Sequence, residues 1–582
     1  MPLSLLVVIA GALALAVGTV KLLRVGRRPA GYPPGPPTLP ILGNLHLMPS
    51  RDPHLQFQKW AQEYGPVYSL ILGTKTLIVL SSDKAVKDLL DKRSDIYSDR
   101  PDAYIAQDLI GGGMRVALMK YGPTWRMIRK MVHNILHVNA AKSYVPYQIL
   151  ENQRMLVNLL DTPDRFFDHI RRYANSLTTQ MIYGFRTTDV DDPKLLRIFE
   201  GIEKVSQAAG LGTAALLDVY PILRYLPNIC APIRPYAKAL HKSEHDLFLG
   251  NWMDAKNAIK NGTAKHSFCV NIIKAQEVSQ FSDSLAGYIG GNLLEAGSET
   301  TADTLVGFVQ AMLVFPDVQQ RAQEEIDRVV GPDRLPTMAD EPNLPYIRAC
   351  VKETLRWMPT VPLGIPHAVI RDDAYMGYTI PKGAGVALNI WAIHMDPARH
   401  PSPRTFSPLR YIHDVQTAAA AALNPDPAAR DHFGFGAGRR ICPGMHIAER
   451  SLFIGIARML WAFSMERPTD REGRQVVPDI ERFTQGLAMM PEPFEARFRV
   501  RGKGREEVVR REWREASGGL DERGQWRVVP KGMALGSVAK GGEGDGYCGV
   551  AVGFKGDGGE VGRGEWVLGA GVGARLGWRT RD

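Results

Sequence analysis

The sequence predicts a mainly α-helical domain with small β-sheets, preceded by one N-terminal transmembrane helix. Amphipathic segments of helix length recur through the middle of the chain, strand patterns are few and short, and an apolar run opens it. With 582 residues, of which 45% are apolar and 23% charged, the chain can bury a large core. We divide it into an N-terminal anchor (1–28), a proline-rich hinge (29–50), the main domain (51–500) and a glycine-rich tail (501–582).

The anchor is predicted from the run Leu3–Val20, 18 residues that only Ser4 and Thr19 interrupt. That length is near the minimum for a helix that spans a bilayer. Basic residues follow the run and no charged residue precedes it, so the positive-inside bias places everything after Arg28 in the cytosol. The alternative is a cleaved signal peptide with its cleavage site near 12–14, but the charges lie on the wrong side of the run for one.

Prolines define the hinge and glycines define the tail. The hexapeptide Tyr32–Pro37 (YPPGPP) cannot be helical, which predicts a stiff extended spacer between anchor and domain. The tail holds 22 of the 57 glycines of the chain and has no sustained helical or strand period. We expect residues 501–582 to be disordered, or an artefact of how the coding region was joined, and to add no core.

The main domain is expected to be mostly helical, with few strands. Val67–Leu72 and Thr76–Leu80 are expected to form a β-hairpin, and two further strand signals, Tyr378–Ile380 and Gly385–Asn389, flank a Pro-Lys-Gly turn. The chain has no GxGxxG after a strand and no GxxxxGK[ST], so it carries no recognisable dinucleotide or flavin domain. Helices are expected near 54–64, 83–92, 123–138, 282–314, 316–330, 343–357 and 445–460.

Cysteine usage and charge restrict the compartment and the partners. The five cysteines are far apart and show neither a disulfide framework nor a zinc spacing, which suits a reducing compartment. The net charge of +10 is spread along the chain, without a basic tract or interleaved aromatic and basic residues. No nucleic-acid partner is therefore expected, and an acidic protein or a membrane surface suits the charge better.

The strongest motif is the segment 433–444, FGFGAGRRICPG, which precedes a predicted helix. The glycines free loop amides and Pro443 suits the first turn of that helix, so Cys442 would lie beside the positive end of the helix dipole. Both features lower the pKa of a thiol, as a metal-bound or reactive cysteine requires. Arg440 is placed to pair with a carboxylate of a ligand over the loop, and Phe435 to shield the sulfur from water.

This segment resembles the haem-binding loop of cytochromes P450, FxxGxRxCxG, at Phe435, Gly438, Arg440, Cys442 and Gly444. The alternative, a buried cysteine in a glycine-rich turn, would not explain all these matches. The resemblance implies the cytochrome P450 fold, a haem cofactor (iron protoporphyrin IX) and Cys442 as the axial thiolate ligand of its iron. An axial thiolate favours O–O cleavage, so the implied reaction inserts one oxygen atom of O2 into a substrate C–H or C=C bond.

A second motif, Ala296–Thr301 (AGSETT), lies inside a predicted helix long enough to cross the domain. A mid-helix glycine, and a threonine hydroxyl bonded to the carbonyl four residues back, would open the helix locally. Cleavage of O2 needs protons, which an alcohol next to a carboxylate can deliver. The segment is similar to the family's [AG]Gx[DE]T[TS] pattern, so we assign Thr300 to the bound oxygen and Glu299 to proton supply as catalytic residues.

Glu353 and Arg356 share one helix face at i,i+3, and they resemble the ExxR motif of the family. In that family the pair joins a later arginine in a buried network, and this arginine corresponds here to Arg410. Leu409 stands where family members usually carry a glutamate, which leaves the local ion pairing open. We interpret the three charged residues as structural support for the haem pocket, not as catalytic groups.

Trp125 and Arg129 stand at i,i+4 and are similar to the WxxxR contacts that family members make to a haem propionate. A surface aromatic–cation pair is the alternative, and Arg126 competes for the role. His367 follows a proline at a place where such proteins often carry another propionate donor, although a lone histidine is more often structural.

These motifs follow one another in the family's order over about residues 30–500, and the chain is most similar to microsomal fungal enzymes of secondary metabolism, of the O-methylsterigmatocystin oxidoreductase type. The resemblance implies a monooxygenase of the endoplasmic reticulum membrane, single-pass with a cytosolic domain, that receives electrons from an NADPH–cytochrome reductase. We expect that it uses O2 to hydroxylate or epoxidise an apolar small molecule, a fungal secondary metabolite. Three alternatives stay open: a haem-thiolate isomerase or dehydratase, a haem-binding membrane protein without turnover and, more weakly, a basic membrane adaptor.

The resemblance also indicates which segments contact the substrate. Apolar residues among them, such as Leu293 and Val361, favour an apolar ligand. The segments are the loops at 100–116 and 205–235, the helix face at 289–296, Thr360–Ile365 and Thr484–Leu487.

Overall fold

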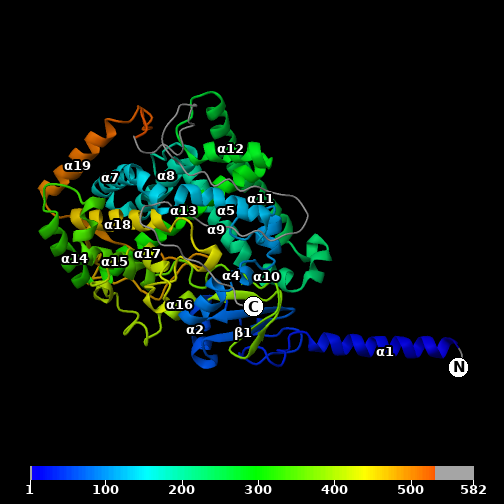
Figure 1. Cartoon of the computed structure of the whole chain (residues 1–582). Coiled ribbons are helices and arrows are strands. Elements are labelled where there is room, and N and C mark those ends of the chain that lie inside the picture. The colour runs from blue at the N-terminus through cyan, green and yellow to red at the C-terminus, as the bar shows by residue number, and fades with distance from the viewer. Residues whose placement is uncertain (1–2, 211, 531–582) are drawn as a thin grey trace, which may run out of the picture. The chain divides into compact units, whose positions relative to one another are not determined.

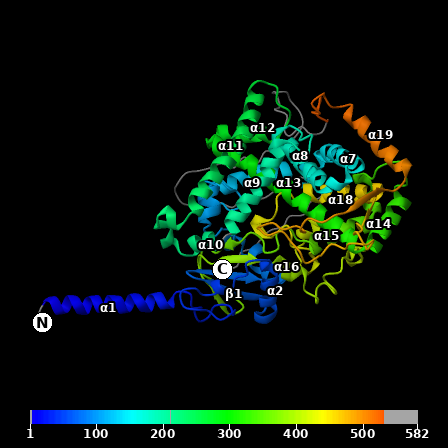
Figure 2. The same cartoon turned by 180° about the vertical axis from the view of Figure 1, so that it is seen from behind.

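Helix α13 (Asp283–Val314) runs through the middle of the helical bundle, as Figures 1 and 2 show from opposite sides. The Ser282 side chain caps its first turn by accepting a hydrogen bond from the Leu285 backbone N–H, and Pro316 begins the next helix. Most side chains of α13 are buried, on all of its faces, as expected of a core helix. Its main packing partners are α8 (Phe166–Tyr183), α11 (Ile233–Lys260) and α18 (Met445–Ala462).

The structure, a computed structural model, describes residues 3–210 and 212–530. Helices dominate these residues and the sheets are small, which confirms the predicted mainly α-helical domain, whereas the transmembrane helix stays a prediction. The remaining α-helices are α1 (Leu3–Arg24), α2 (Pro53–Tyr64), α3 (Asp83–Val86), α4 (Ser94–Tyr97), α5 (Pro123–Leu136), α6 (Val138–Ser143), α7 (Val145–Asp161), α9 (Pro193–Gly210), α10 (Gly212–Val219), α12 (Phe268–Ser279), α14 (Pro316–Val329), α15 (Pro345–Trp357), α16 (Ile390–His394), α17 (Ala418–Ala422) and α19 (Lys503–Ser517). The 3₁₀ and π turns are η1 (Leu45–Leu47), η2 (Lys87–Asp91), η3 (Tyr104–Ile110), η4 (Pro163–Arg165), η5 (Pro221–Tyr225), η6 (Asn228–Cys230), η7 (Met338–Asn343), η8 (Pro408–Tyr411), η9 (Pro427–Ala429) and η10 (Gly438–Arg440).

The strands form three small sheets. The largest has the order β1-β2-β6-β3, in which β2 pairs antiparallel with β1 and parallel with β6. The other two sheets are the antiparallel pairs β4-β5 and β7-β8. The strands are β1 (Val67–Leu72), β2 (Lys75–Leu80), β3 (His367–Ala368), β4 (Asp373–Tyr375), β5 (Tyr378–Ile380), β6 (Gly385–Leu388), β7 (Phe463–Glu466) and β8 (Arg497–Val500).

The predicted hairpin is confirmed, and so are the two strands predicted on either side of the Pro-Lys-Gly turn. β1 and β2 pair in register from Val67 with Leu80 to Leu72 with Lys75. β5 and β6 do not pair with each other, because β5 pairs back onto β4 while β6 joins β2 and β3 in the largest sheet. The Pro-Lys-Gly turn therefore connects two sheets. A local turn signal could not show that β6 has a partner some three hundred residues earlier in the chain.

The prediction that the chain adds no core after residue 501 is wrong for the first part of the tail. Helix α19 buries Val508 and Val509 in the same apolar cluster as α13 and α18. Farther on, the Trp526 Nε1–H donates to Gln180 Oε1 of α8 at 2.7 Å. Apolar positions of α19 share one face among many charged residues, so the amphipathic signal is present but weak. Residues 531–582 of the predicted tail lie outside the described residues.

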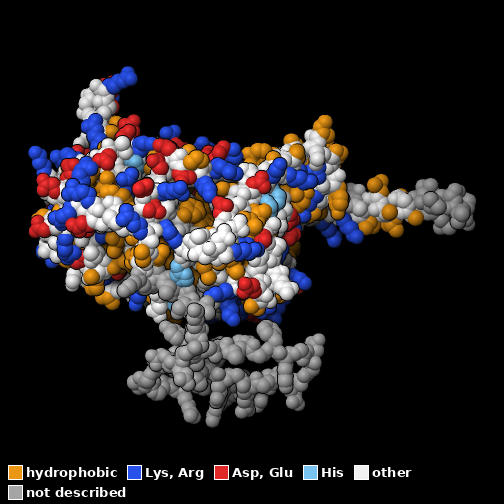
Figure 3. Space-filling model, turned by 90° about the horizontal axis from the view of Figure 1, so that it is seen from above, with side chains coloured by type: hydrophobic (Ala, Val, Ile, Leu, Met, Phe, Trp, Pro, Cys, Tyr) orange, Lys and Arg blue, Asp and Glu red, His pale blue; other side chains and the backbone are white. Residues whose placement is uncertain are grey.

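Within the described residues, no single helix is both long and apolar enough to span a membrane, and α13 and α14 meet that test only as a pair bent by 106°. In α1, large apolar side chains such as Leu13 (64% exposed) and Leu15 (73%) face outward, and Lys21 and Arg24 lie in the last turn. On the face of the molecule in Figure 3, acidic and basic side chains are interspersed.

Candidate active site

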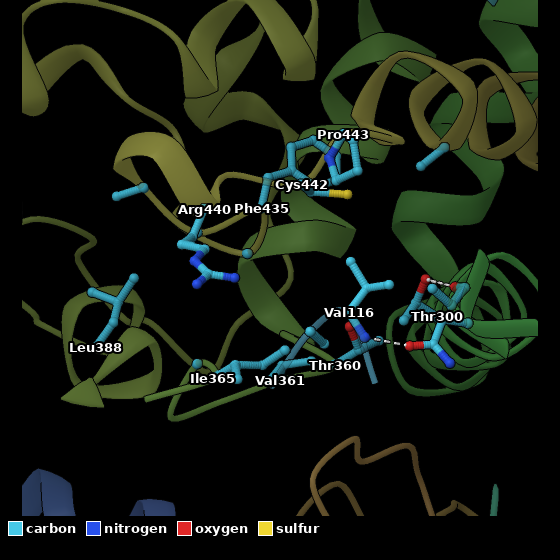
Figure 4. A pocket seen from close by; sticks show the side chains of 18 of the residues that line it. Val116, Thr300, Thr360, Val361, Ile365, Leu388, Phe435, Arg440, Cys442 and Pro443 are labelled. Carbon is cyan, nitrogen blue, oxygen red and sulfur yellow. Dashed lines mark hydrogen bonds between the residues drawn. The ribbon is translucent and has the colours of Figure 1, made fainter. Parts of the chain in front are cut away.

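A cavity of about 320 Å³ lies between α13 and the cysteine loop, Phe433–Gly444. Its walls also include residues of α5, α15, β6 and the first turns of α18, and most of the lining side chains are apolar. Figure 4 shows Cys442 and Thr300 among the side chains around it. The fold therefore brings the two strongest sequence motifs to one cavity.

Two fixed points hold the cysteine loop. The Cys442 backbone N–H donates to the Phe435 carbonyl oxygen at 2.8 Å, which folds the loop back on itself. Gly438 has φ +63°, and a Cβ atom there would lie 2.0 Å from the Leu90 carbonyl oxygen, so only glycine fits. Its N–H donates to Asp91 Oδ1 at 2.8 Å, which ties the loop to η2.

Opposing effects act on the Cys442 thiol, at the start of α18. Burial raises its pKa, while the backbone N–H groups of Gly444 and Met445 and the charge of Arg129 lower it. The net direction is upward, so the predicted lowering is wrong for the free thiol, because burial outweighs the loop amides. A thiol that coordinates a metal ion is deprotonated outright. A Cβ at Gly444 would lie 3.9 Å from the sulfur, an ordinary contact, so the described residues alone do not require glycine there.

Basic side chains cluster on the cavity wall. Arg100, Arg129, Arg440 and His367 all line it. Burial lowers the pKa of Arg100 to about 9 and that of Arg440 to about 10. Arg440 donates from Nε to the Ser98 carbonyl and from Nη2 to the Met119 carbonyl, both at 2.8 Å. Its Nη1 is buried without a hydrogen-bond partner among the described residues. A buried cationic cluster with a free donor suits an anionic ligand.

Arg100 is a site residue that sequence reasoning missed. Its guanidinium donates to the carbonyl oxygens of Ala117 (2.8 Å), Ile365 (2.6 Å) and Pro366 (2.7 Å), so it joins two walls of the cavity. It is 5% exposed. The sequence offered only its place at the start of the predicted substrate loop 100–116.

Trp125 and Arg129 both line the cavity, whereas Arg126 is exposed and is not among the lining residues. The guanidinium carbon of Arg440 lies 4.0 Å from the Trp125 ring centroid, a cation–π contact. Arg129 Nη2 donates to the Ile441 carbonyl oxygen, so it also holds the cysteine loop. The competing role of Arg126 is therefore excluded.

His367 is buried at 5% exposure, and its Nδ1 lies 2.7 Å from the Tyr97 carbonyl oxygen. That contact requires Nδ1 to carry the proton, which leaves Nε2 as an acceptor in the neutral ring. Burial, followed by the charge of Arg100, lowers the pKa of His367 to about 3. It would donate to a carboxylate only after Nε2 takes up a proton, which the negative charge of that carboxylate favours.

Thr300 lines the cavity, and its Oγ1–H donates to the Ala296 carbonyl oxygen at 2.8 Å, as predicted. Glu299 is not among the residues that line the cavity. Burial, and then the negative charge of Glu295, raise the pKa of Glu299 to about 7. The two predicted catalytic residues are therefore neighbours in sequence, but only the alcohol faces the cavity.

The predicted local opening of α13 is wrong. The α-helix is continuous across residues 296–301. Gly297 instead permits close packing, since a Cβ there would lie 2.6 Å from Thr178 Oγ1 of α8. The glycine serves the contact between two helices.

The predicted ExxR network forms among Glu353, Arg356 and Arg410. Arg356 donates to Glu353 through Nε to Oε2 and through Nη2 to Oε1, both at 2.7 Å, and both side chains are 0% exposed. Arg410 Nε reaches Glu353 Oε1 at 3.3 Å. Leu409 is 51% exposed, so the absence of a glutamate there does not break this network.

His394 connects this network to the cysteine loop, and the sequence did not indicate it. Its Nδ1 lies 2.9 Å from the Arg356 carbonyl oxygen, and its Nε2 accepts from the Phe433 backbone N–H at 2.7 Å. Burial lowers the pKa of His394 well below its ordinary value, so the ring stays neutral and can accept. One imidazole therefore joins α15 to the first residue of the loop.

Some of the segments that were predicted to contact the substrate line the cavity. Ile289, Leu293 and Ala296 of α13 line the cavity, and so do Thr360 and Val361. The segments 205–235 and 484–487 contribute none of the lining residues.

The chain matches the family model of cytochrome P450 over residues 33–498. It belongs to the cytochrome P450 family. It is 54% identical over 514 residues to cytochrome P450 monooxygenase virE of Hypocrea virens, which covers 88% of this chain and 93% of that protein. It is 49% identical to cytochrome P450 monooxygenase fogE of Aspergillus ruber (89% and 96% covered) and 51% identical to cytochrome P450 monooxygenase fsoB of Humicola fuscoatra (88% and 95% covered).

A solved structure of a zebra fish cytochrome P450 with abiraterone has the same fold. It superposes with a TM-score of 0.62 at 24% identity, covering 78% of this chain and all of that one. Membership of the family and the named relatives make this protein a cytochrome P450 monooxygenase with haem as its cofactor.

The cavity of this cytochrome P450 fits haem. Its apolar walls suit the porphyrin, and the Cys442 thiol on one wall suits the iron. The free Arg440 Nη1 suits a propionate, with Arg100, Arg129 and His367 around it. The donor set thus matches each chemical part of the cofactor.

Proposed function

We propose that this enzyme inserts one oxygen atom of O2 into a C–H or C=C bond of an apolar small molecule, a fungal secondary metabolite, with Cys442 as the axial ligand of the haem iron. The observation that carries the proposal is that Cys442 and Thr300 line one cavity with mostly apolar walls. The chemistry that haem supplies when bound is O2 activation and cleavage at iron, which an axial thiolate favours.

The residues of this chain then have separate tasks. The propionate end of the cofactor would be held by four residues: Trp125, Arg100, Arg129 and Arg440. His367 would join them as a donor when it is protonated. Phe435 would shield the sulfur from water: it is 8% exposed, lines the same cavity as Cys442, and its carbonyl accepts from the Cys442 N–H. Low water access around the thiolate protects it from side reactions.

Thr300 and Glu299 supply protons in this account. The Thr300 hydroxyl can accept a proton on one side and pass one on from the other, because it is both donor and acceptor. Glu299 with a pKa near 7 is protonated in part of the molecules at neutral pH and can replace the proton that Thr300 gives away. This pair favours monooxygenation over a haem-thiolate isomerase or dehydratase, which needs no proton supply for O2.

Electrons come from an NADPH–cytochrome reductase that docks on the Cys442 side. Arg126 and Lys130 of α5 and Arg439 of the cysteine loop are exposed, so they offer positive charge near the haem edge. Opposite charges on two surfaces speed association. Charge reversal at Lys130 should slow the first electron transfer and reduce its dependence on salt, as stopped-flow reduction under carbon monoxide would show.

We further propose that α1 holds the enzyme in the endoplasmic reticulum membrane as a single span, with the domain in the cytosol. Its outward apolar side chains and the basic residues of its last turn support this orientation. A chain without residues 1–28 should leave the membrane fraction after carbonate extraction. If it remains there to the same extent as the full chain, α1 is not the anchor.

The reaction itself is tested with purified enzyme, a fungal NADPH–cytochrome reductase and isotope-labelled O2, against a panel of apolar aromatic and terpenoid compounds. The expected product gains one labelled oxygen atom and consumes NADPH. Product formation without O2 and NADPH would instead favour the isomerase or dehydratase.

A further inference from the structure

The segment Gly111–Met119 forms part of the wall of the cavity. Val116 and Ala117 line the cavity, whereas the segment begins with three consecutive glycines. Gly112 and Gly113 have φ +55° and +76°, in the left-handed region that glycine adopts without strain. The Gly113 N–H donates to the Gln107 carbonyl at 2.7 Å and the Gly113 carbonyl accepts from Gln107 Nε2 at 2.8 Å, so the glycines are fixed to η3. They form the end about which residues 114–116 can turn.

The two ends of the segment are held differently. At its C-terminal end the Ala117 carbonyl accepts from Arg100 and the Met119 carbonyl accepts from Arg440, both at 2.8 Å. These contacts tie residues 117–119 to the residues that hold the cofactor. Residues 114–116 are tied to the rest of the segment by the Met114 N–H, which donates to the Gly111 carbonyl at 2.9 Å, and by the Leu118 N–H, which donates to the Arg115 carbonyl at 3.1 Å. Their hydrogen bonds outside the segment are with two helices.

Those contacts centre on Arg115, whose side chain is 13% exposed. Its Nη2 forms an ion pair with Glu244 Oε2 of α11, and its Nη1 lies 3.1 Å from Glu295 Oε2 of α13. The next backbone N–H, of Val116, donates to Asn292 Oδ1 of α13 at 2.6 Å. One side chain and one amide thus join the loop to both helices.

This arrangement is only partly satisfied. Arg115 Nε and Asn292 Nδ2 are buried without a hydrogen-bond partner within the part of the chain that the structure describes. Two carboxylates face one guanidinium, and burial raises the pKa of Glu295 and raises that of Glu244 to about 7. Buried polar groups without hydrogen-bond partners destabilise the closed arrangement of the segment. Opening it to water would hydrate each of these groups.

We propose that Arg115 is a latch, which holds residues 114–116 against α11 and α13 and whose release opens a route for substrate into the cavity. Arg115 is a positioning residue in this account, because it acts through the placement of Val116 and the wall behind it. The inference rests on the proposed function only in taking the cavity as the substrate site.

The experiment compares the holoenzyme with its Arg115→Gln variant in two measurements. Hydrogen–deuterium exchange should become about tenfold faster for residues 114–117 in the variant, because removing one partner of a buried ion pair destabilises the closed state. In stopped-flow mixing of the ferric enzyme with 4-phenylimidazole, the association and dissociation rates should both rise about tenfold as well.

Two further variants sharpen the result. Arg115→Lys keeps the charge but cannot reach both glutamates at once, so its rates should fall between those of the wild type and Arg115→Gln. Arg334→Gln, which breaks the Arg334–Asp340 ion pair away from the cavity lining, should leave both measurements unchanged. If Arg115→Gln does not hold haem, Glu244→Gln replaces it in the same assays.

Unchanged exchange and unchanged azole rates in a variant with an intact Soret band would overturn the latch. Loss of the thiolate-type carbon monoxide spectrum in the wild type would instead overturn the proposed function. The exchange measurement does not depend on turnover, so the two failures can be told apart.

Discussion

The guanidinium carbon of Arg440 lies 4.0 Å from the centroid of the Trp125 ring, so the cysteine loop and α5 meet face to face at the cationic wall of the cavity. Two backbone carbonyls take the Nε and Nη2 donors of Arg440. The ring therefore fixes the plane of the guanidinium, which leaves Nη1 available for a ligand. The WxxxR pattern consequently supports the cofactor through the loop as well as by direct contact.

Replacement of Trp125 by leucine should weaken haem retention by up to about thirtyfold, because a desolvated cation–π contact contributes about 2 kcal/mol. The ratio of Soret to protein absorbance, and the rate of haem transfer to apomyoglobin, would measure this. Trp513→Leu on α19 is the matched control. The guanidinium carbon of Arg154 lies 5.3 Å from the centroid of that ring, and neither residue lines the cavity. Equal retention in the two variants would contradict the role of Trp125.

Glu353→Gln should lower the free energy of unfolding by about 3–5 kcal/mol, because it leaves the guanidinium of Arg356 buried without a charge partner. Urea unfolding followed by tryptophan fluorescence would give the value. Arg410→Gln should cost clearly less, since Arg410 makes one contact of 3.3 Å to Glu353 and is 13% exposed. The account fails here if the two variants unfold at the same urea concentration.

Glu299 should give the reaction a pH dependence near neutrality. Its pKa is raised to about 7, so the fraction that can donate a proton falls as pH rises through 7. We expect O2-dependent turnover of the reconstituted enzyme to fall over that range, and Glu299→Gln to be slower without this limb. Glu203→Gln, at an exposed position of α9, should keep the wild-type profile. A wild-type profile in Glu299→Gln would exclude it from proton supply.

The same shift affects stability with a defined sign. The folded state favours protonated Glu299, so the stabilisation linked to that proton is fully present below the ordinary pKa of about 4.5. It is lost as pH rises through about 7, and it does not change further above that value. Glu299→Gln should therefore flatten the decline in stability between these two pH values.

Truncation tests the first part of the tail. A chain that ends after Pro530 keeps α19 and Trp526, whereas a chain that ends after Gly502 loses the burial of Val508 and Val509. Full burial of such side chains stabilises a fold by about 1.5–3 kcal/mol each. The shorter chain should therefore melt several degrees lower in calorimetry. Identical melting of the two chains would show that α19 adds nothing to the core.

The sequence predicted the elements whose signals are local. The period of apolar residues indicated α5, α13, α14 and α15, and Cys442 with its loop followed from a dense motif. The wrong predictions concern properties that depend on groups distant in the sequence. Whether burial or loop amides control the pKa of the Cys442 thiol depends on how deeply α13 and α18 enclose it. The period of α19 was missed because charged residues surround its few apolar positions.

Arg100 and His394 show why part of the site could not be predicted. Both act by bonding backbone carbonyls or amides of segments remote in sequence, and a backbone group leaves no trace in residue identity. Thr300 was found because residues 296–301 resemble a motif of the family, and its hydrogen bond to the Ala296 carbonyl could be expected because that group lies one helical turn away. Contacts within one helical turn can be predicted from the sequence, whereas contacts between loops depend on how the whole chain folds.

The central claim is that Cys442 is the axial ligand of the haem iron. The most direct test is the absorption spectrum of the reduced, carbon-monoxide-bound enzyme, measured for the wild type and for Cys442→Ala. The account predicts a red-shifted, thiolate-type Soret band in the wild type and its loss in the variant. A histidine-type band in the wild type, or the same thiolate band in Cys442→Ala, would contradict it.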